Sequence, residues 1–265
     1  MQTRLCIALL VTQVMSAQER QTGQGVNFYS PAKEAAIGAK LAQQERQRTT
    51  PISNAAVRGY VERIGQKLAA EFPNAGLTYT FEVIADAVGG PTHEPLSLPG
   101  GYIFVPASLI LTARNEAEFA GMLAHAMAHC AERHGSRQAT RGEIANLSTI
   151  PWVFVGGEQQ LVPIGLRSFQ RRFETEADLL AVKMAASAAY DPEGLVSYIG
   201  RVQPEAVNSA MPARESRIAG MEKAIQQLPP KIYTSTGEFR SIQYEVRQAM
   251  PGTPLQPPSL VRVNR

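Results

Sequence analysis

The sequence predicts one mainly helical α+β domain with a small sheet. Most of the chain consists of stretches whose hydrophobic residues recur at helical spacing, and only two short stretches carry the pattern of strands. No internal repeat is evident in the 265 residues, which are enough to bury a good core. A hydrophobic fraction of 44% and a charged fraction of 18% are ordinary for a soluble globular protein. We therefore expect a single folded domain that covers residues 18–250.

Residues 1–17 have the features of an export signal: an early arginine, an apolar run from Leu5 to Val14, and small residues at the end. A buried N-terminal helix is the alternative interpretation. Removal of this segment would also remove Cys6 and leave Cys130 alone, which excludes a disulfide framework. We expect the mature protein to be periplasmic or secreted.

The rest of the chain excludes two classes of partner. No later run approaches the ~20 apolar residues that span a membrane, and the longest candidate, Ile144–Val155, is too short. The net charge of +3 is spread without basic clusters, so nothing indicates a nucleic-acid partner. The proline-rich residues 251–265 are expected to form a flexible tail.

Two helices are predicted first. Ser30 and Pro31 open a helix that runs to Arg48, because a capping serine followed by proline favours a helix start. Pro51 and Asn54 introduce the second helix. Hydrophobic residues share one face of it at helical spacing, namely Val57, Tyr60, Val61, Ile64 and Leu68.

Two strands follow. Alternation of hydrophobic and polar residues from Leu77 to Val83 predicts a half-buried strand. Residues Asp86–Leu98, with two glycines and two prolines, are expected to form a loop. A tight turn at Pro99-Gly100-Gly101 then leads to a short strand over Tyr102–Val105.

The next stretch, Asn115–Gly135, predicts a helix with two histidines on one face. Asn115 can cap it, Glu118 completes a capping box, and Gly135 stands where a helix usually stops. His125 and His129 are four residues apart, so their imidazoles lie one turn apart on the same face. That spacing is typical of a zinc-binding helix, although such pairs also arise by chance as core or solvated residues.

The remaining chain is expected to be helical with one irregular apolar stretch. Helices are predicted over Ser136–Leu147 and Leu166–Ala188, and Asp191-Pro192 caps another. Residues 150–165 are apolar and broken by glycines and prolines. Pro229-Pro230 introduces the last hydrophobic stretch, with Ile232, Phe239, Ile242 and Val246.

A zinc site needs at least a third protein ligand. Glu174 and Asp178 in the Leu166–Ala188 helix are also four apart, so they offer a carboxylate ligand with an acid one turn on that can orient an imidazole. A plain charged helix face, to which Arg171 and Arg172 would contribute, is the alternative.

Ordered blocks over roughly residues 31–250 resemble the gluzincin metallopeptidases related to the type-1 CAAX prenyl protease, HtpX and the periplasmic BepA-type proteases. The blocks are LPGGYIFV (98–105), NEAEFAGMLAHAMAHCAERHG (115–135), RRFETEAD (171–178), AAYDPEGLVSYI (188–199) and MPARESRI (211–218). The resemblance implies a zincin-like metallopeptidase domain with the small sheet beside the zinc helix, and an envelope peptidase acting on exported proteins.

The resemblance also implies residue roles. His125, His129 and Glu174 correspond to the three zinc ligands, Asp178 to the acid behind them, and Arg217 to the arginine of the active-site block. An extended polypeptide would add alongside the strand Tyr102, Ile103, Phe104 and Val105.

Two positions depart from that pattern. Ala126 stands where the family has the glutamate that acts as general base, and Met211 stands where it has a histidine near the zinc. The three ligands remain, so we expect one zinc ion and peptide hydrolysis that is weak or absent, since a positioned base is worth ~10²–10⁴ in rate. The alternative is a non-catalytic zinc-binding relative that binds or regulates exported proteins.

Most of the other polar residues are expected to have structural or surface roles. His93 and Glu94 lie in the loop before the tight turn, where either could compensate for the missing base, but the surface interpretation is favoured. Cys130 is expected to be a small core residue, and His134 to close the helix near its negative end. Trp152 is expected in the core, with the wall of a substrate groove as the alternative.

Overall fold

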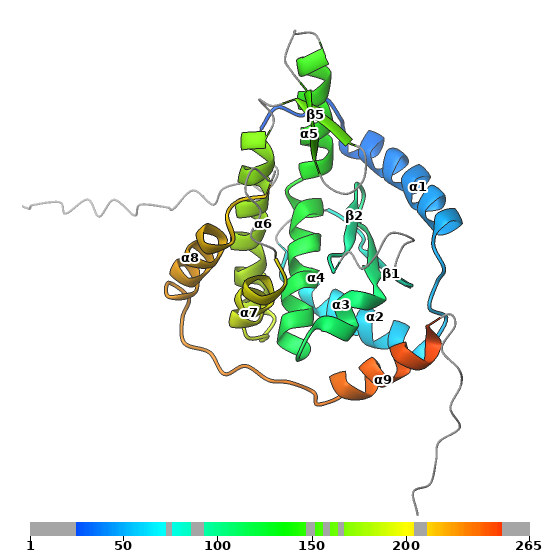
Figure 1. Ribbon diagram of the computed structural model, residues 1–265, viewed down its shortest axis with the longest axis vertical. Coiled ribbons are helices and arrows are strands. Elements are labelled where there is room, and N and C mark those ends of the chain that lie inside the picture. The colour runs from blue at the N-terminus through cyan, green and yellow to red at the C-terminus, as the bar shows by residue number, and fades with distance from the viewer. Residues whose placement is uncertain are drawn as a thin grey trace, which may run out of the picture.

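A computed structural model describes residues 25–72, 76–85, 93–146, 152–155, 160–163, 167–203 and 211–250. The expected export segment 1–17 and the tail 251–265 lie outside the described residues. The structure confirms the mainly helical α+β class with a small sheet (Figure 1). In chain order the elements are α1 (Pro31–Arg48), α2 (Ala55–Ala69), β1 (Thr80–Ile84), β2 (Leu96–Leu98), β3 (Tyr102–Pro106), α3 (Ala107–Thr112), α4 (Glu116–Ala131), α5 (His134–Asn146), β4 (Trp152–Val155), β5 (Gln160–Pro163), α6 (Arg167–Ser187), α7 (Glu193–Val202), α8 (Arg214–Ile225) and α9 (Phe239–Ala249).

The capping residues identified in the sequence start their helices. The Ser30 hydroxyl accepts the backbone N–H of Lys33 at the start of α1, and the Asn54 side chain accepts two N–H groups of α2. The Asn115 side chain accepts the N–H of Glu118 at the start of α4. These side chains satisfy backbone donors that have no partner within the helix.

The three-stranded sheet has the order β1-β3-β2, with β1 parallel and β2 antiparallel to β3. The first strand begins at Thr80 and not at Leu77, and residues 96–98, expected in a loop, form β2. Gly101, with φ of 93°, lies so close to the Thr78 carbonyl that a Cβ atom would be 2.6 Å from that oxygen, which keeps the turn before β3 tight.

The prediction that a polypeptide adds alongside Tyr102–Val105 is wrong, because that strand is already paired on both sides. Tyr102–Val105 belong to the central strand β3, which is hydrogen bonded to β1 on one side and to β2 on the other. An added peptide needs unpaired backbone groups, which only an edge strand offers. The short strand β2 is the edge beside α4, because α4 and β2 are in contact.

The helix boundary near Gly135 also differs from the expectation. The helix α4 ends at Ala131, and α5 starts at His134, so Gly135 lies inside a helix. Arg133 makes the break with a left-handed φ of 57°. Its guanidinium donates to the buried Glu34 carboxylate at 2.9 and 3.0 Å and to the Tyr29 carbonyl at 2.6 Å, and these bonds hold the unusual conformation. Further along, β4 and β5 form a hairpin in the stretch expected to be irregular.

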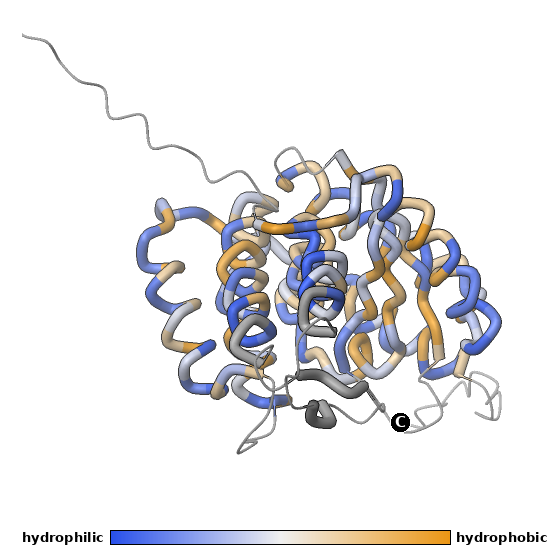
Figure 2. The backbone as a smooth tube through the Cα atoms, turned by 90° about the horizontal axis from the view of Figure 1, so that it is seen from above, coloured by the Kyte–Doolittle hydropathy of each residue, from blue (hydrophilic) through white to orange (hydrophobic). Residues whose placement is uncertain are grey.

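The helix α4 lies at the centre of the molecule, between the sheet on one side and α6 and α7 on the other (Figure 1). Most of its residues are buried, including His125. Gly194 lets α7 approach closely, since a Cβ atom there would lie 2.4 Å from the backbone of Ala117. The outer helices alternate hydrophilic and hydrophobic segments, as expected for helices with one buried face (Figure 2). Within the described residues, none of the helices combines the length and apolar character needed to cross a bilayer.

Candidate metal centre

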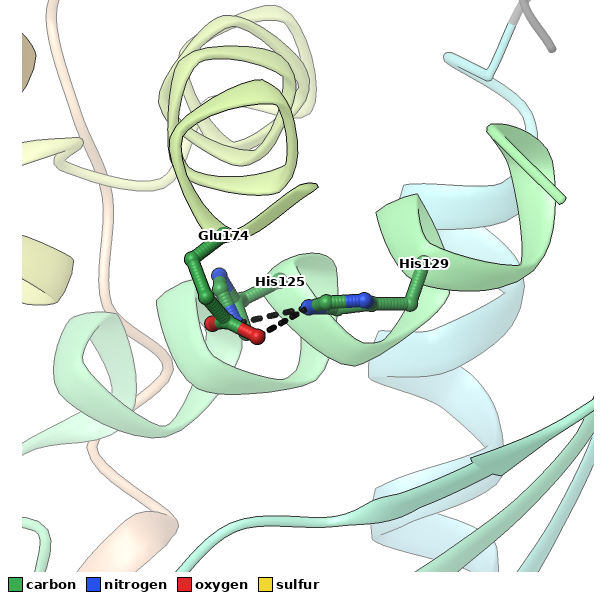
Figure 3. Close-up of side chains that lie close together, drawn as sticks. All are labelled: His125, His129 and Glu174. Atoms are coloured by element: carbon green, nitrogen blue, oxygen red, sulfur yellow. Dashed lines mark hydrogen bonds and ion pairs between the residues drawn. The ribbon is translucent and has the colours of Figure 1, made fainter. Parts of the chain in front are cut away.

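The two histidines of α4 and a glutamate of α6 meet at one point (Figure 3). The Nε2 atoms of His125 and His129 are 3.1 Å apart. Glu174 places Oε2 3.4 Å from His125 Nε2 and Oε1 3.7 Å from His129 Nε2. The spacing of four residues on α4 therefore brings the two imidazoles together as expected, and the packing of α6 on α4 supplies the carboxylate.

These distances fit a tetrahedral zinc ion. With Zn–N and Zn–O bonds of about 2.0–2.1 Å, neighbouring ligand atoms lie about 3.3–3.4 Å apart. The observed separations of 3.1, 3.4 and 3.7 Å bracket that value. Two imidazole nitrogens and a carboxylate oxygen are also ligands that Zn²⁺ commonly takes in proteins. The side chains present can hold the metal that the sequence implies.

Asp178 and Arg217 support His125 from behind. His125 Nδ1 lies 3.0 Å from Asp178 Oδ1, although the N–H does not point straight at this oxygen. Arg217 donates two hydrogen bonds of 2.7 Å to the Asp178 carboxylate and lies 3.8 Å from Glu174. Both supporting groups are buried, and an acid in this position orients a metal-binding imidazole. Both Asp178 and Arg217 are where the sequence placed them.

The same contacts set the charge states around His125. Burial alone would lower the pKa of His125, but Asp178 and Glu174 outweigh burial and raise it to about 9. Burial opposes ionisation of Asp178, and the guanidinium of Arg217 nevertheless holds the pKa of that carboxyl below its usual range. Burial is likewise overcome at Glu174, where His129 and His125 hold the pKa well below its usual range. The centre is thus built for positive charge between ionised carboxylates.

A second support, behind His129, was not predicted from the sequence. His129 Nδ1 lies 3.1 Å from His134 Nδ1, and His134 Nε2 lies 3.2 Å from Glu176 Oε2. The expectation that His134 closes the zinc helix is wrong, because His134 begins α5 after the turn at Arg133. That turn points His134 back at His129. The sequence signal was the position of His134, five residues after His129, but only the break in the helix brings the two rings together.

These distances fix one arrangement of protons. If His129 Nε2 faces the metal, Nδ1 carries the proton and donates it to His134 Nδ1, and His134 Nε2 then donates to Glu176. Burial lowers the pKa of His134 to about 4, so His134 is neutral and can accept at Nδ1. Each imidazole of the pair therefore has an oriented partner on the side away from Glu174.

Arginines complete this second support. Arg137 donates to Glu176 at 3.2 Å and Arg172 donates to it at 2.7 Å. Burial would raise the pKa of Glu176, but hydrogen bonds from His134 and Arg172 lower it to about 2. The group Glu132, His134 and Glu176 has spacing that would suit a metal ion. The guanidinium of Arg137 already supplies the positive charge there, 3.8 Å from Glu132.

The ligands face a hollow of about 190 Å³ that opens at the edge of the sheet. Glu94, Pro95, Leu96 and Ser97 form one side of it, and His125, Ala126, His129 and Glu174 form the other. Ala126 is buried and contributes only a methyl group. Neither Met211 nor Cys130 lines this hollow; the buried Cys130 thiol donates to the Leu98 carbonyl instead.

Glu94 is exposed, as the surface interpretation expects, and it also lines this hollow together with the ligands. His93 points elsewhere, with Nδ1 3.2 Å from the Thr112 hydroxyl. The sequence signal for Glu94 was its position just before the tight turn, in a loop long enough to reach the zinc helix. The side chain of Trp152, for which two roles were open, lies outside the described residues.

Comparison with known proteins agrees with the geometry. A family model described as Peptidase family M48 matches residues 55–225, more than half of the chain. The beta-barrel assembly-enhancing protease of Escherichia coli is 20% identical over 239 residues, which is 79% of this chain and 47% of that protein. The mitochondrial metalloendopeptidase OMA1 of Schizosaccharomyces pombe is 28% identical over 190 residues, which is 66% of this chain and 55% of that protein. The chain spans about half the length of the curated relatives it matches.

Proposed function

Since this chain belongs to peptidase family M48, we propose that it is a zinc endopeptidase that cleaves extended segments of exported proteins slowly. The observation that carries the proposal is the convergence of His125, His129 and Glu174 in a hollow that opens beside the edge strand β2. Metallopeptidase activity is the family's chemistry. The substrate class, the cell-envelope location and the low rate are our additions to it.

The edge strand gives the substrate a place to bind. Leu96 and Ser97 of β2 line the hollow, and Leu96 is 41% exposed. A polypeptide in extended form can pair its backbone with the unpaired side of β2, which carries its scissile bond past the ligands. Only a segment without stable structure can adopt that form, so unfolded proteins are the expected substrates.

The low rate follows from residue 126. A bound zinc ion would polarise the scissile carbonyl and favour ionisation of water. The protein must still supply a group that takes the proton, and Ala126 has none. A positioned base contributes about 10²–10⁴ in rate, so we expect cleavage to be slower than in a variant with glutamate there by that order.

A second candidate is a protein that binds unfolded exported proteins without cleaving them. Two departures favour it: Ala126 lacks the base and Met211 replaces the family's histidine. A periplasmic or secreted location suits both candidates and rests on the apolar segment Leu5–Val14.

Metal analysis and a cleavage assay test the proposal together. The purified protein is expected to hold about one zinc per chain, and His129→Ala to lose it. Fluorescently labelled casein, an unfolded protein, serves as the substrate for the native chain and for Ala126→Glu. Slow cleavage by the native chain and fast cleavage by the variant support an endopeptidase. No zinc in the native chain, or no cleavage by either protein, would overturn the proposal.

A further inference from the structure

We propose that Glu94 is the catalytic carboxylate of this chain, taking the proton that residue 126 cannot take. The inference rests on the proposed endopeptidase function and names the residue that carries its slow reaction. Three observations support it: the position of Glu94 in the hollow, the way its segment is held, and its absence from the group of ligand atoms.

Glu94 and Ala126 line the same hollow as the ligands. Glu94 belongs to the segment that leads into β2, whereas Ala126 lies on α4 between the two histidines. Glu94 is thus a carboxylate of the same hollow to which residue 126 contributes only a methyl group.

The residue before Glu94 is fixed in an unusual conformation. His93 has a left-handed φ of 57°, which is uncommon for residues other than glycine. Its carbonyl accepts a hydrogen bond of 3.0 Å from the hydroxyl of Tyr198, a buried residue of α7, and its ring contacts Thr112. Pro95, which is buried, restricts the backbone on the other side. Strain of this kind is kept where the surroundings hold it in place, and here it aims Glu94.

Charged groups of the metal centre act on Glu94. The residue is exposed at the mouth of the hollow, but its carboxyl group lies in the electric field of Glu174, His125, Arg217 and His129. Surrounding protein atoms and the negative charge of Glu174 raise the pKa of Glu94, and the cationic groups partly offset this effect.

The position of Glu94 fits a proton acceptor better than a fourth ligand. His125, His129 and Glu174 present ligand atoms within 4.8 Å of one another, and Glu94 is not a member of that group. It lines the same hollow, and a proton acceptor works through a water molecule and takes no ligand position itself. A fourth protein ligand would instead close the position that catalysis needs.

The reaction balances with Glu94 as the acceptor and later the donor. The oxygen of one water adds to the scissile carbonyl carbon, and one water proton passes to a carboxylate oxygen of Glu94. Glu94 then delivers this proton to the leaving amide nitrogen as the C–N bond breaks. One water is consumed, one carboxyl and one amino end form, and Glu94 returns to its ionised state.

Glu94→Gln in the full-length, zinc-loaded protein tests this role, because glutamine keeps the shape and cannot accept the proton. We expect casein cleavage to fall about tenfold or more, while zinc content is unchanged. Glu71→Gln, an exposed position after α2, is the matched control and should leave the rate unchanged. Glu174→Ala, purified in the same way, gives the background from contaminating peptidases.

A double-mutant comparison separates catalysis from a structural role. When Ala126→Glu restores a base, Glu94→Gln should cost less than about threefold in rate, because proton transfer no longer depends on Glu94. A structural role would lower the rate equally in both backgrounds, and that result would overturn the inference.

Binding measurements give a second readout. A peptide hydroxamate, whose hydroxyl group can hydrogen bond to a carboxylate beside the metal, should bind the zinc-loaded Glu94→Gln protein about tenfold more weakly. A loss of zinc affinity in Glu94→Gln would make Glu94 a ligand and refute the role of base. Cleavage by Ala126→Glu with none above background by the native chain would refute the inference alone, since the endopeptidase fold and zinc site would then stand.

Discussion

The two halves of the hollow contrast sharply. On the α4 and α6 side, each metal-binding imidazole is backed by a buried chain of partners: Asp178 and Arg217 behind His125, and His134 and Glu176 behind His129. On the other side of the ligands, residue 126 is a buried alanine, and the segment before β2 brings the exposed Glu94 to the hollow. The supports behind the ligands belong to the packed core, whereas the proposed proton acceptor is a single exposed side chain.

The two halves also differ in what a substitution costs in stability. Removing Asp178 or Arg217 leaves a buried charge without its partner, which costs far more than the removal of a side chain at the wall of a hollow. Ala126 leaves no polar group without a partner, because a methyl group has none. The ligand half is therefore constrained by stability as well as by function, and the catalytic half by function alone.

The largest expected effect is on the cleavage rate, when a carboxylate is introduced at residue 126 and the contrast between the two halves of the hollow is removed. Ala126→Glu places a carboxylate in the hollow, and casein cleavage should rise about 10²–10⁴-fold at unchanged zinc content. Ala126→Gln introduces a side chain as long as glutamate but without a carboxylate. It is therefore the matched control and should not raise the cleavage rate. Equal rates for the two variants would show that residue 126 is not the position of the base.

The second effect tests the buried charge pair. Arg217→Ala leaves Asp178 buried without its guanidinium and should lower the free energy of unfolding of the metal-free protein by about 3–5 kcal/mol. Arg63→Ala removes an ion pair with Glu238 whose side chains are 56% and 51% exposed, and it should cost about 0–1 kcal/mol. Urea unfolding of both variants measures the difference. Similar losses would mean that burial does not set the cost at this site.

The third effect concerns the support behind His129. His134→Phe keeps a ring against Phe173, whose centroid lies 4.4 Å away, but removes both nitrogens. Zinc affinity, measured by competition with a chelator, should fall about 10–100-fold. Cys130→Ala, on α4 beside His129, leaves the imidazole contacts in place and should keep the native affinity. An unchanged affinity in His134→Phe would refute the support by His134.

The smallest expected effect is on stability and comes from a substitution away from the metal centre. Tyr60 donates a hydrogen bond of 2.8 Å to the buried Glu116 carboxylate, which also accepts from Thr236. Tyr60→Phe should cost about 1–2 kcal/mol in stability, since the carboxylate keeps its other partners. Zinc affinity should not change. A parallel loss of zinc affinity would indicate that the core and the ligand half respond as one unit.

Local rules in the sequence predicted much of the fold. Ser30, Asn54 and Asn115 marked helix starts, because a side-chain oxygen there satisfies backbone donors whatever lies elsewhere in the chain. The end of α4 was missed, since the left-handed turn at Arg133 depends on Glu34 and Tyr29, about a hundred residues away. The strand β2 was missed for the same reason: three residues have no periodicity to detect until β3 pairs with them.

For the site, the sequence by itself indicated the candidate ligands. Helical spacing puts His125 and His129 on one face, and the spacing of Glu174 and Asp178 does the same on α6, because the geometry of a helix is local. Only the tertiary structure decided what surrounds them. The pairing of His134 with His129, the central position of β3 and the presence of Glu94 in the hollow each depend on contacts between distant segments. Such contacts follow from packing of the whole chain, and no local pattern in the sequence encodes them.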